Sequence, residues 1–255
     1  MASPAIGFFD SGLGGISVLA DAVKALPRED FLYLGDSANA PYGVKAPDEV
    51  LRLVRNAAGG LARMGVKALV IACNTASSVA ASALRGEYAF PIIALEPALK
   101  PAAESGGTGA ILVMATPLTL SSKSYRRLHA RYGERAVPLP CPGLMEFVER
   151  EELDSPGLHE YLDNLLSPFS GQQVDAAVLG CTHYLFLREA IRSHLPRGTR
   201  LMDSNAGVVR QLIRRLEGEN LLTQSPGPGK VEIVSTGGRD KAEQMERMLR
   251  RYSER

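Results

Sequence analysis

The chain has 255 residues, a length typical of one or two domains that bury a sizeable core. Hydrophobic residues make up 45% and charged residues 22% of the sequence, an ordinary balance that excludes a disordered chain. The 29 Lys and Arg residues against 28 Asp and Glu residues leave a formal net charge of +1, and no basic run exceeds two residues. We therefore expect a small-molecule partner and no nucleic acid.

The N-terminal segment has neither a basic region nor a long apolar region, so we expect no secretory signal. The longest apolar runs, such as 68–73, have the length of a strand and are too short to cross a membrane. These features predict a cytoplasmic protein. Because a reducing compartment disfavours disulfides, Cys73, Cys141 and Cys181 each need a separate explanation.

In chain order, short apolar runs alternate with longer segments of helical period, which is typical of βαβ units and a mostly parallel sheet. Strands are predicted at 5–9, 31–34, 68–72, 92–95, 110–114, 176–179, 200–202 and 231–234. The segments 47–64 and 240–252 have apolar residues at helical spacing and are predicted to be helices that cover a sheet. The predicted fold class is therefore α/β.

Turn residues near positions 96–107 and 205–207 divide the strands into two groups. We predict two pseudo-symmetric lobes, each a mostly parallel sheet covered by helices, with the active site in the cleft between them. Residues 1–96 and 208–255 form the first predicted lobe, which holds Asp10 and Cys73, and residues 97–207 form the second, which holds Cys181 and His183.

Two segments of the sequence are similar, 69–75 (LVIACNT) and 178–183 (VLGCTH). Each is an apolar strand followed by a cysteine and polar side chains, and in open α/β sheets the residues just beyond a strand's carboxyl end line the ligand site. Nearby donors and helix N-termini lower a thiol pKa, so this position favours catalysis over packing for Cys73 and Cys181. Cys141 stands between two prolines and is predicted to be structural.

Spacing excludes several kinds of cysteine chemistry. No Cys-x-x-Cys pair is present, so a thioredoxin-like site is excluded. A tyrosine-phosphatase loop needs Arg six residues after its cysteine, where this chain has Val79 and Leu187. Zinc bound by Cys181, His183, Cys73 and Asp10 is a weak alternative because the ligands are scattered along the chain, and we predict no metal.

The segment 10–15 (DSGLGG) follows the first predicted strand and leads into a helix from Ile16. It is not a dinucleotide fingerprint, because Ser17 stands where Gly or Ala is required and Asp10 would repel a pyrophosphate. Glycine N–H groups and Ser11 could hold a carboxylate, while Asp10 pairs with an ammonium group or steers a proton. The alternative for Asp10 is an N-cap of the helix.

Two equivalent thiols beside a carboxylate-binding loop suggest inversion of an amino-acid α-carbon. Removing a proton from one face and returning one to the other requires two acid/base groups across the substrate. Asp10 beside Cys73 and His183 beside Cys181 would set which thiol is charged. The polar segment 35–43 and the hydroxyls of Thr116 and Thr119 add donors at other strand ends.

These motifs together resemble those of the cofactor-independent glutamate racemases in the aspartate/glutamate racemase superfamily, over nearly the whole chain. The motifs are 10–15, 35–43, 72–75, 96–97, 116–119 with Ser122 and Tyr125, 141–142 with Glu149, 180–184 and 203–204. The resemblance implies interconversion of L- and D-glutamate without pyridoxal phosphate or metal, supplying D-glutamate for peptidoglycan. It also implies a homodimer, because members of this family often dimerise.

The resemblance assigns roles to individual residues. Cys73 and Cys181 match the family's two catalytic thiols, and Asp10 and His183 match its assisting acid/base residues. The implied substrate contacts are Ser11, Pro41, Tyr42, Gly43, Asn74, Thr75, Thr116, Thr119 and Thr182. The chain departs from the family pattern at Asn39, where Arg is common, and at Leu185, where Pro is common, and neither position matches a catalytic residue.

Three other functions stay open at this point. A racemase for aspartate or another amino acid would differ only in the pocket for the side chain. An acyl-transfer enzyme would use Cys181 as nucleophile and His183 as base, leaving Cys73 dispensable. A non-catalytic module would bind glutamate without exchanging its α-proton.

Overall fold

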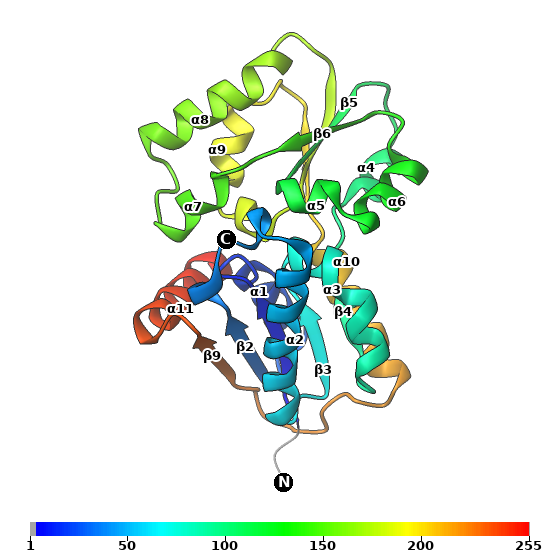
Figure 1. Cartoon of the computed structure of the whole chain (residues 1–255), viewed down its shortest axis with the longest axis vertical. Helices are drawn as coiled ribbons and strands as arrows, with labels where there is room; N and C mark the ends of the chain where they lie inside the picture. Colours follow the sequence, from blue (N-terminus) through cyan, green and yellow to red (C-terminus); the bar gives the residue numbers. More distant parts are fainter. Residues whose placement is uncertain (1–3, 255) are drawn as a thin grey trace.

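The computed structural model describes residues 4–254, which form two α/β lobes placed one above the other in Figure 1. The lower lobe, called the first lobe, is built on a five-stranded sheet, and the upper one, the second lobe, on a four-stranded sheet. Neighbouring strands are parallel in both sheets. The predicted α/β class with two mostly parallel sheets covered by helices is confirmed.

The first lobe has the strand order β4-β3-β1-β2-β9. Its strands are β1 (Ile6–Asp10), β2 (Phe31–Gly35), β3 (Ala68–Ile71), β4 (Ile92–Ala94) and β9 (Val231–Ser235). Side chains of the central strand β1 alternate between two buried clusters, with Ile6 and Phe8 in one and Phe9 in the other. Since both faces of the sheet are buried, β1 is apolar along almost its whole length.

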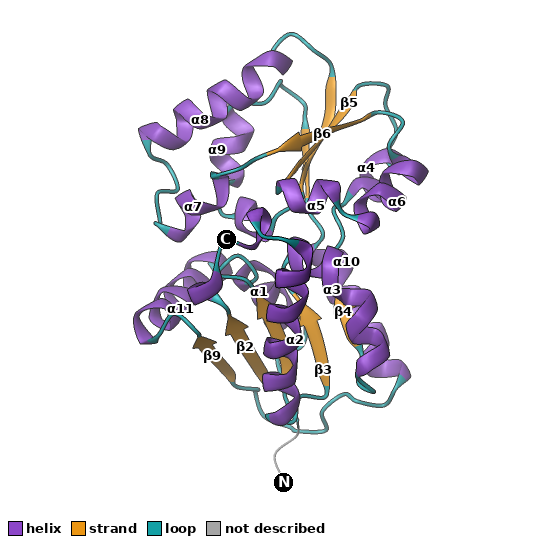
Figure 2. Cartoon of the chain, viewed as in Figure 1, coloured by secondary structure: helices purple, strands orange, loops and turns teal. Residues whose placement is uncertain are grey.

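Helices cover both faces of the first sheet (Figure 2). The cluster with Ile6 and Phe8 includes side chains of α1 (Ile16–Ala25), α10 (Asn205–Gly218) and α11 (Arg239–Ser253). The cluster with Phe9 includes side chains of α2 (Pro47–Arg63) and α3 (Asn74–Glu87). Two short 3₁₀ helices, η1 (Ser37–Asn39) and η2 (Tyr42–Val44), form the loop after β2.

The second lobe has the strand order β6-β5-β7-β8. Its strands are β5 (Ala110–Ala115), β6 (Ala136–Pro140), β7 (Val174–Leu179) and β8 (Arg200–Met202). Its helices are α4 (Leu99–Glu104), α5 (Pro117–Ser121), α6 (Lys123–Tyr132), α7 (Leu144–Glu149), α8 (Pro156–Leu166), η3 (Ser167–Phe169), η4 (Thr182–Leu185) and α9 (Arg188–Ser193). Here too, neighbouring residues of β5 alternate between two buried clusters, with Ile111 and Val113 in one and Leu112 and Met114 in the other.

Strand β6 was not predicted from the sequence. It contains Pro138 and Pro140, which lack the N–H that a strand ladder uses, and prolines argue against a central strand. The structure resolves the contradiction by placing β6 at the edge of its sheet, where only β5 is a neighbour. Edge strands tolerate proline because one side of their backbone needs no partner strand.

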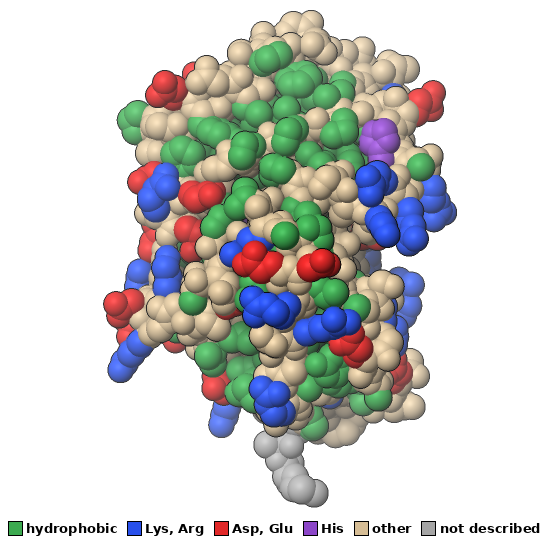
Figure 3. All heavy atoms as spheres, viewed as in Figure 1, with side chains coloured by type: hydrophobic (Ala, Val, Ile, Leu, Met, Phe, Trp, Pro, Cys, Tyr) green, Lys and Arg blue, Asp and Glu red, His purple; other side chains and the backbone are tan. Residues whose placement is uncertain are grey.

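The two lobes share one hydrophobic cluster, which contains Leu13 and Ile16 from the first lobe and Leu144 and Tyr184 from the second. On the face shown in Figure 3, acidic and basic side chains intermingle over the first lobe, while hydrophobic side chains gather on the second. Within the described residues, every helix is too short or too polar to cross a membrane.

Candidate active site

The two predicted catalytic cysteines follow strands of different lobes. Cys73 follows β3 and caps α3, with its Sγ 3.4 Å from the backbone N of Ala76 and 3.4 Å from the Oγ of Ser11. Cys181 follows β7, and its Sγ lies 3.7 Å from Nδ1 of His183. Both thiols are buried. Each sulfur therefore has its own polar neighbours, as expected for acid/base groups that approach one substrate from two sides.

The predicted lowering of the thiol pKa is wrong for Cys73. Burial, with smaller effects from the charges of Asp10 and Cys181, raises its pKa to about 12, although hydrogen bonds from Ala76 and Ser11 oppose the rise. The two cysteines also differ in the helix that follows them, because Cys73 caps the α-helix α3 while Cys181 precedes only the single 3₁₀ turn η4.

Asp10 lies fully buried at the end of β1. The N-cap of α1 is Gly15, so the N-cap alternative for Asp10 is wrong. Its Oδ1 accepts a hydrogen bond from Gly12 N at 2.7 Å, and its Oδ2 accepts one from Thr182 Oγ1 at 3.3 Å. Burial raises the pKa of Asp10 to about 6, against the lowering effect of His183. Asp10 can therefore gain or lose a proton near neutral pH.

His183 connects Cys181 to a carboxylate. Its Nε2 lies 2.9 Å from Oε1 of Glu149, and its Nδ1 faces Cys181. A carboxylate at Nε2 selects the protonated form of that nitrogen and leaves Nδ1 for the thiol.

Burial alone lowers the pKa of His183, but hydrogen bonds and charges of Cys181 and Glu149 hold it well above its ordinary value. Likewise burial raises the pKa of Glu149, but His183 brings it down to about 2. The two groups form an ion pair.

The glycine loop between β1 and α1 packs tightly against His183. Leu13 N donates a hydrogen bond to Oε1 of Glu149 at 3.0 Å, and Tyr33 Oη donates one to Gly12 O at 2.9 Å. A Cβ at Gly14 would collide with the ring of His183 and lie 2.7 Å from its backbone N. Glycine is required here by the close approach of the two lobes.

Threonine hydroxyls join the lobes on the other side of the site. Thr75 Oγ1, at the start of α3, lies 2.9 Å from Thr116 Oγ1 and 3.3 Å from Thr119 Oγ1. Gly43 also packs against Thr116, where a Cβ would lie 2.7 Å from the threonine Cβ. Asn74 Oδ1 is buried and has no hydrogen-bond partner among the described residues. These groups form a buried, neutral surface of donors and acceptors.

The loop with Pro41, Tyr42 and Gly43 is held by a carboxylate that the sequence did not single out. Asp36 accepts hydrogen bonds from Tyr42 Oη at 2.6 Å, from Asn39 Nδ2 at 2.9 Å and from Thr236 Oγ1 at 2.7 Å. Thr236 follows β9, about 200 residues further along the chain. Such a contact carries no local sequence signal, because only the folded sheet brings β2 and β9 together.

The structure thus brings together Asp10, Ser11, Cys73, Asn74, Thr75, Thr116, Thr119, Cys181, Thr182 and His183 where the carboxyl ends of both sheets meet, with the Pro41–Gly43 loop at Thr116. Cys141 is buried, and its Sγ donates to Leu139 O at 3.2 Å. Glu149 belongs to the site through His183 and Leu13, although its role could not be read from the sequence. Within residues 4–254, no group of His, Cys, Asp or Glu side chains is arranged to hold a metal ion.

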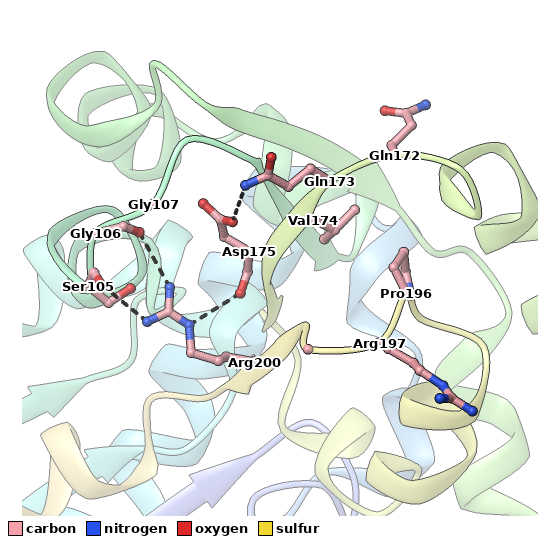
Figure 4. Close-up of a pocket in the computed structure, with 11 residues that line it drawn as sticks. Ser105, Gly106, Gly107, Gln172, Gln173, Val174, Asp175, Pro196, Arg197 and Arg200 are labelled. Carbon is pink, nitrogen blue, oxygen red and sulfur yellow. Dashed lines mark hydrogen bonds between the residues drawn. The ribbon is translucent and has the colours of Figure 1, made fainter.

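A pocket of about 410 Å³ lies elsewhere in the second lobe (Figure 4). It is lined by Val174 and Arg200, the first residues of β7 and β8, and by none of the predicted site residues. Arg200 donates hydrogen bonds there to the carbonyls of Ser105 and Asp175. Ligands of open α/β sheets bind at the carboxyl ends of the strands, so this pocket at the amino ends is separate from the candidate active site.

Residues 11–212 match the model of the Asp/Glu/hydantoin racemase family. The glutamate racemase of Clostridium perfringens is 45% identical over 234 residues, which cover 91% of this chain and 90% of the relative. The glutamate racemase of Clostridium botulinum (strain Hall) is 47% identical over 233 residues, covering 91% of both chains.

Solved structures of glutamate racemases are similar over almost the whole chain. The Thermus thermophilus enzyme in complex with β-chloro-D-alanine has a TM-score of 0.80 and 37% identity, covering 95% of this chain and 93% of that chain. The Escherichia coli enzyme in complex with L-glutamate and the activator UDP-MurNAc-Ala has a TM-score of 0.83 and 31% identity, covering 98% and 96%. The Francisella tularensis enzyme in complex with D-glutamate has a TM-score of 0.83 and 27% identity, covering 97% and 93%.

Proposed function

The chain belongs to the Asp/Glu/hydantoin racemase family and is an amino-acid racemase, an isomerase, and from this premise we propose that it interconverts L- and D-glutamate. The relatives that are 45% and 47% identical over 91% of the chain are both glutamate racemases. Similar solved structures hold L-glutamate in one case and D-glutamate in another. A glutamate racemase has to accept both of these enantiomers as substrates.

The proposed reaction uses Cys73 and Cys181 as the two acid/base groups. The thiolate of one cysteine removes the α-proton: the Cα–H bond breaks, an S–H bond forms, and the electron pair stays on the α-carbon. The thiol of the other cysteine then donates its proton to the opposite face and becomes the thiolate. The reverse reaction begins from this second protonation state, so both directions use the same two groups.

The observation that supports this reaction most strongly is the pair of buried cysteines after β3 and β7, each with a different polar partner. In our proposal His183 exchanges a proton with Cys181 through Nδ1, while Glu149 stabilises the imidazolium. Asp10 assists Cys73 and accepts a hydrogen bond from the substrate ammonium group. A carboxyl whose pKa is about 6 is suited to change its protonation during turnover near neutral pH.

Substrate binding has to lower the pKa of Cys73 so that its thiolate can form. With a pKa of about 12, only about one thiol in 10⁵ would be ionised at pH 7. A positive charge within about 4–6 Å lowers the pKa of an acid by roughly 1–3 units. The α-ammonium group of glutamate supplies such a charge when it donates hydrogen bonds to Asp10 and to the unpartnered Oδ1 of Asn74.

The remaining proposed contacts hold the two carboxylates of the substrate. They are Ser11, Pro41, Tyr42, Gly43, Thr75, Thr116, Thr119 and Thr182, which offer hydroxyl and backbone groups and no cation. Neutral donors fixed by the fold stabilise a carboxylate without adding a charge that would compete with the substrate ammonium for Asp10.

The two proposed lobes consist of residues 1–96 with 208–255 and of residues 97–207.

Family membership also leads us to propose that the product D-glutamate supplies peptidoglycan synthesis in the cytoplasm, and that the protein acts as a homodimer. The activity itself is tested by polarimetry of the purified protein with the separate enantiomers of glutamate, aspartate and alanine. We expect loss of optical rotation with both glutamate enantiomers and at least 100-fold lower kcat/KM with the other amino acids. A preference for aspartate, or no racemisation of glutamate, would contradict the proposal.

A further inference from the structure

The C-terminal helix α11 of the first lobe contacts Glu149 at the end of α7 in the second lobe. Lys241 Nζ lies 3.4 Å from Glu149 Oε2 and 2.8 Å from Gln244 Oε1. Gln244 Nε2 donates a hydrogen bond to the main-chain carbonyl of Glu149 at 2.9 Å. Two neighbouring side chains of one helix therefore hold both the carboxylate and the backbone of Glu149.

The two oxygens of the Glu149 carboxylate have separate partners. Oε1 accepts from Leu13 N at 3.0 Å and faces His183 Nε2 at 2.9 Å, while Oε2 faces Lys241. A partial rotation about the last side-chain bond would lengthen all three contacts. An ion pair at Oε2 resists that rotation, so it keeps Oε1 aligned with His183.

We propose that Lys241 and Gln244 are positioning residues, which act through Glu149 to orient His183 toward Cys181. The inference rests on the proposed function, because it assigns Cys181 and His183 to proton transfer. Lys241 is 37% exposed, so its ion pair contributes little to global stability. Glu149 is only 14% exposed and His183 is 3% exposed, so a small displacement of this pair acts directly at the site.

The electrostatics of Glu149 agree with this geometry. Burial raises the pKa of Glu149, but the hydrogen bond and charge of His183, the hydrogen bond from Leu13 N and, least of these, the charge of Lys241 bring it down to about 2. Glu149 is therefore a carboxylate throughout the working pH range. Lys241 is not needed to ionise Glu149, so its remaining effect is on the orientation of the carboxylate.

Lys241→Met removes the cation and keeps most of the side-chain volume. We expect kcat/KM for glutamate to fall about fivefold, the effect of a partly exposed ion pair. Lys241→Arg should restore at least half of the activity. The matched control is Arg247→Met, which removes a cation from the same helix, where Arg247 pairs with Glu151 and leaves Glu149 untouched.

A second readout separates positioning from a general loss of structure. The two enantiomers of glutamate are equally stable, so kcat/KM must fall equally in both directions, whichever step is slowed. The primary isotope effects from α-deuterated substrates are free to differ. If Lys241→Met slows transfer at Cys181, the isotope effect should rise for the enantiomer that Cys181 deprotonates and fall for the other. A general structural defect would leave the two effects in their wild-type ratio.

A third readout does not depend on activity. The chain has four histidines, so nitrogen NMR of protein labelled with ¹⁵N-histidine can follow His183 once a His183→Gln spectrum assigns it. Lys241→Met should shift the His183 ring signals, and Arg247→Met should not. If the wild-type protein does not racemise glutamate, the proposed function fails, and the NMR comparison alone decides the inference. If Lys241→Met matches Arg247→Met in the spectra and in both kinetic readouts, the inference is overturned.

Discussion

Thr182 Oγ1, which follows β7 in the second lobe, donates a hydrogen bond of 3.3 Å to Oδ2 of Asp10, which ends β1 in the first lobe. This contact joins the two sheets at the site. The carboxyl group of Asp10 is fully buried at this contact, and its loss of hydration raises its pKa to about 6. The protonation of Asp10 is therefore coupled to the packing of the two lobes.

Replacing Asp10 with Asn should make the protein relatively more stable at high pH. A carboxyl whose pKa rises on folding, here from 3.8 to about 6, binds its proton more tightly in the folded state. This group therefore costs stability as pH rises through that window, with the full cost above about pH 6. Between pH 4 and pH 7.5, we expect Asp10→Asn to gain roughly 2–3 kcal/mol in unfolding free energy relative to wild type.

Urea unfolding at the two pH values measures this difference, and the racemase activity of Asp10→Asn should fall about 100-fold or more at the same time. The comparison between pH values removes the constant effect of exchanging a carboxyl for an amide. An unfolding free-energy difference between variant and wild type that stays the same from pH 4 to pH 7.5 would show that the pKa of Asp10 is not raised.

The three cysteines should respond differently to substitution by Ala. Loss of Cys73 or Cys181 removes one of the two proton-transfer groups, so each variant should lose at least 10³-fold in kcat. Cys141 donates to Leu139 O and has no proposed role in proton transfer, so Cys141→Ala should keep kcat within about threefold and destabilise the fold by about 1 kcal/mol. Polarimetry and thermal unfolding measure these effects. Substantial racemisation by Cys73→Ala would favour a single-thiol reaction at Cys181.

Glu149→Gln should uncouple His183 from its ion pair. Without the carboxylate, burial lowers the pKa of His183 with less opposition, so we expect its NMR titration to move to lower pH than in wild type. The imidazolium then supports Cys181 less well, and kcat should fall about tenfold to 100-fold. Glu151→Gln is the control, because Glu151 pairs with Arg247 outside the site. Equal effects of the two substitutions would refute a special role for Glu149.

Gly14→Ala should inactivate the protein through contact with His183. The added Cβ would collide with the imidazole, and the nearby backbone N of His183 leaves it no room to shift. We expect kcat/KM to fall at least 100-fold. Gly60→Ala on α2 is the control, because its Cβ meets no atom within 4 Å; it should keep full activity and stabilise the helix by about 0.5–1 kcal/mol. Full activity of Gly14→Ala would show that the loop can move away from His183.

The sequence predicts the strands with local apolar patterns well, and it places Cys73 and Cys181 after β3 and β7. It fails for β6, whose prolines are acceptable only because the strand lies at an edge, and edge position is a property of the assembled sheet. The sequence predicts that residues 208–255 belong to the first lobe, but the chain pattern alone does not place β9 beside β2 in the strand order.

The site shows the same division between local and long-range information. The composition around Cys73 suggests a lowered thiol pKa, because donors are visible in the sequence while burial is not. Burial dominates in the folded chain and raises that pKa to about 12. Lys241 and Gln244 reach Glu149 across 92 and 95 residues, so no motif could connect them to His183 before the fold was known.

The central claim is that two thiols act on opposite faces of one α-carbon, and the most direct test is racemisation of each glutamate enantiomer in deuterium oxide, stopped at low conversion. The α-proton leaves to one cysteine while solvent deuterium arrives from the other. We therefore predict that the newly formed enantiomer carries deuterium and that the remaining substrate carries almost none, from both L- and D-glutamate. Equal labelling of substrate and product would contradict the two-thiol account.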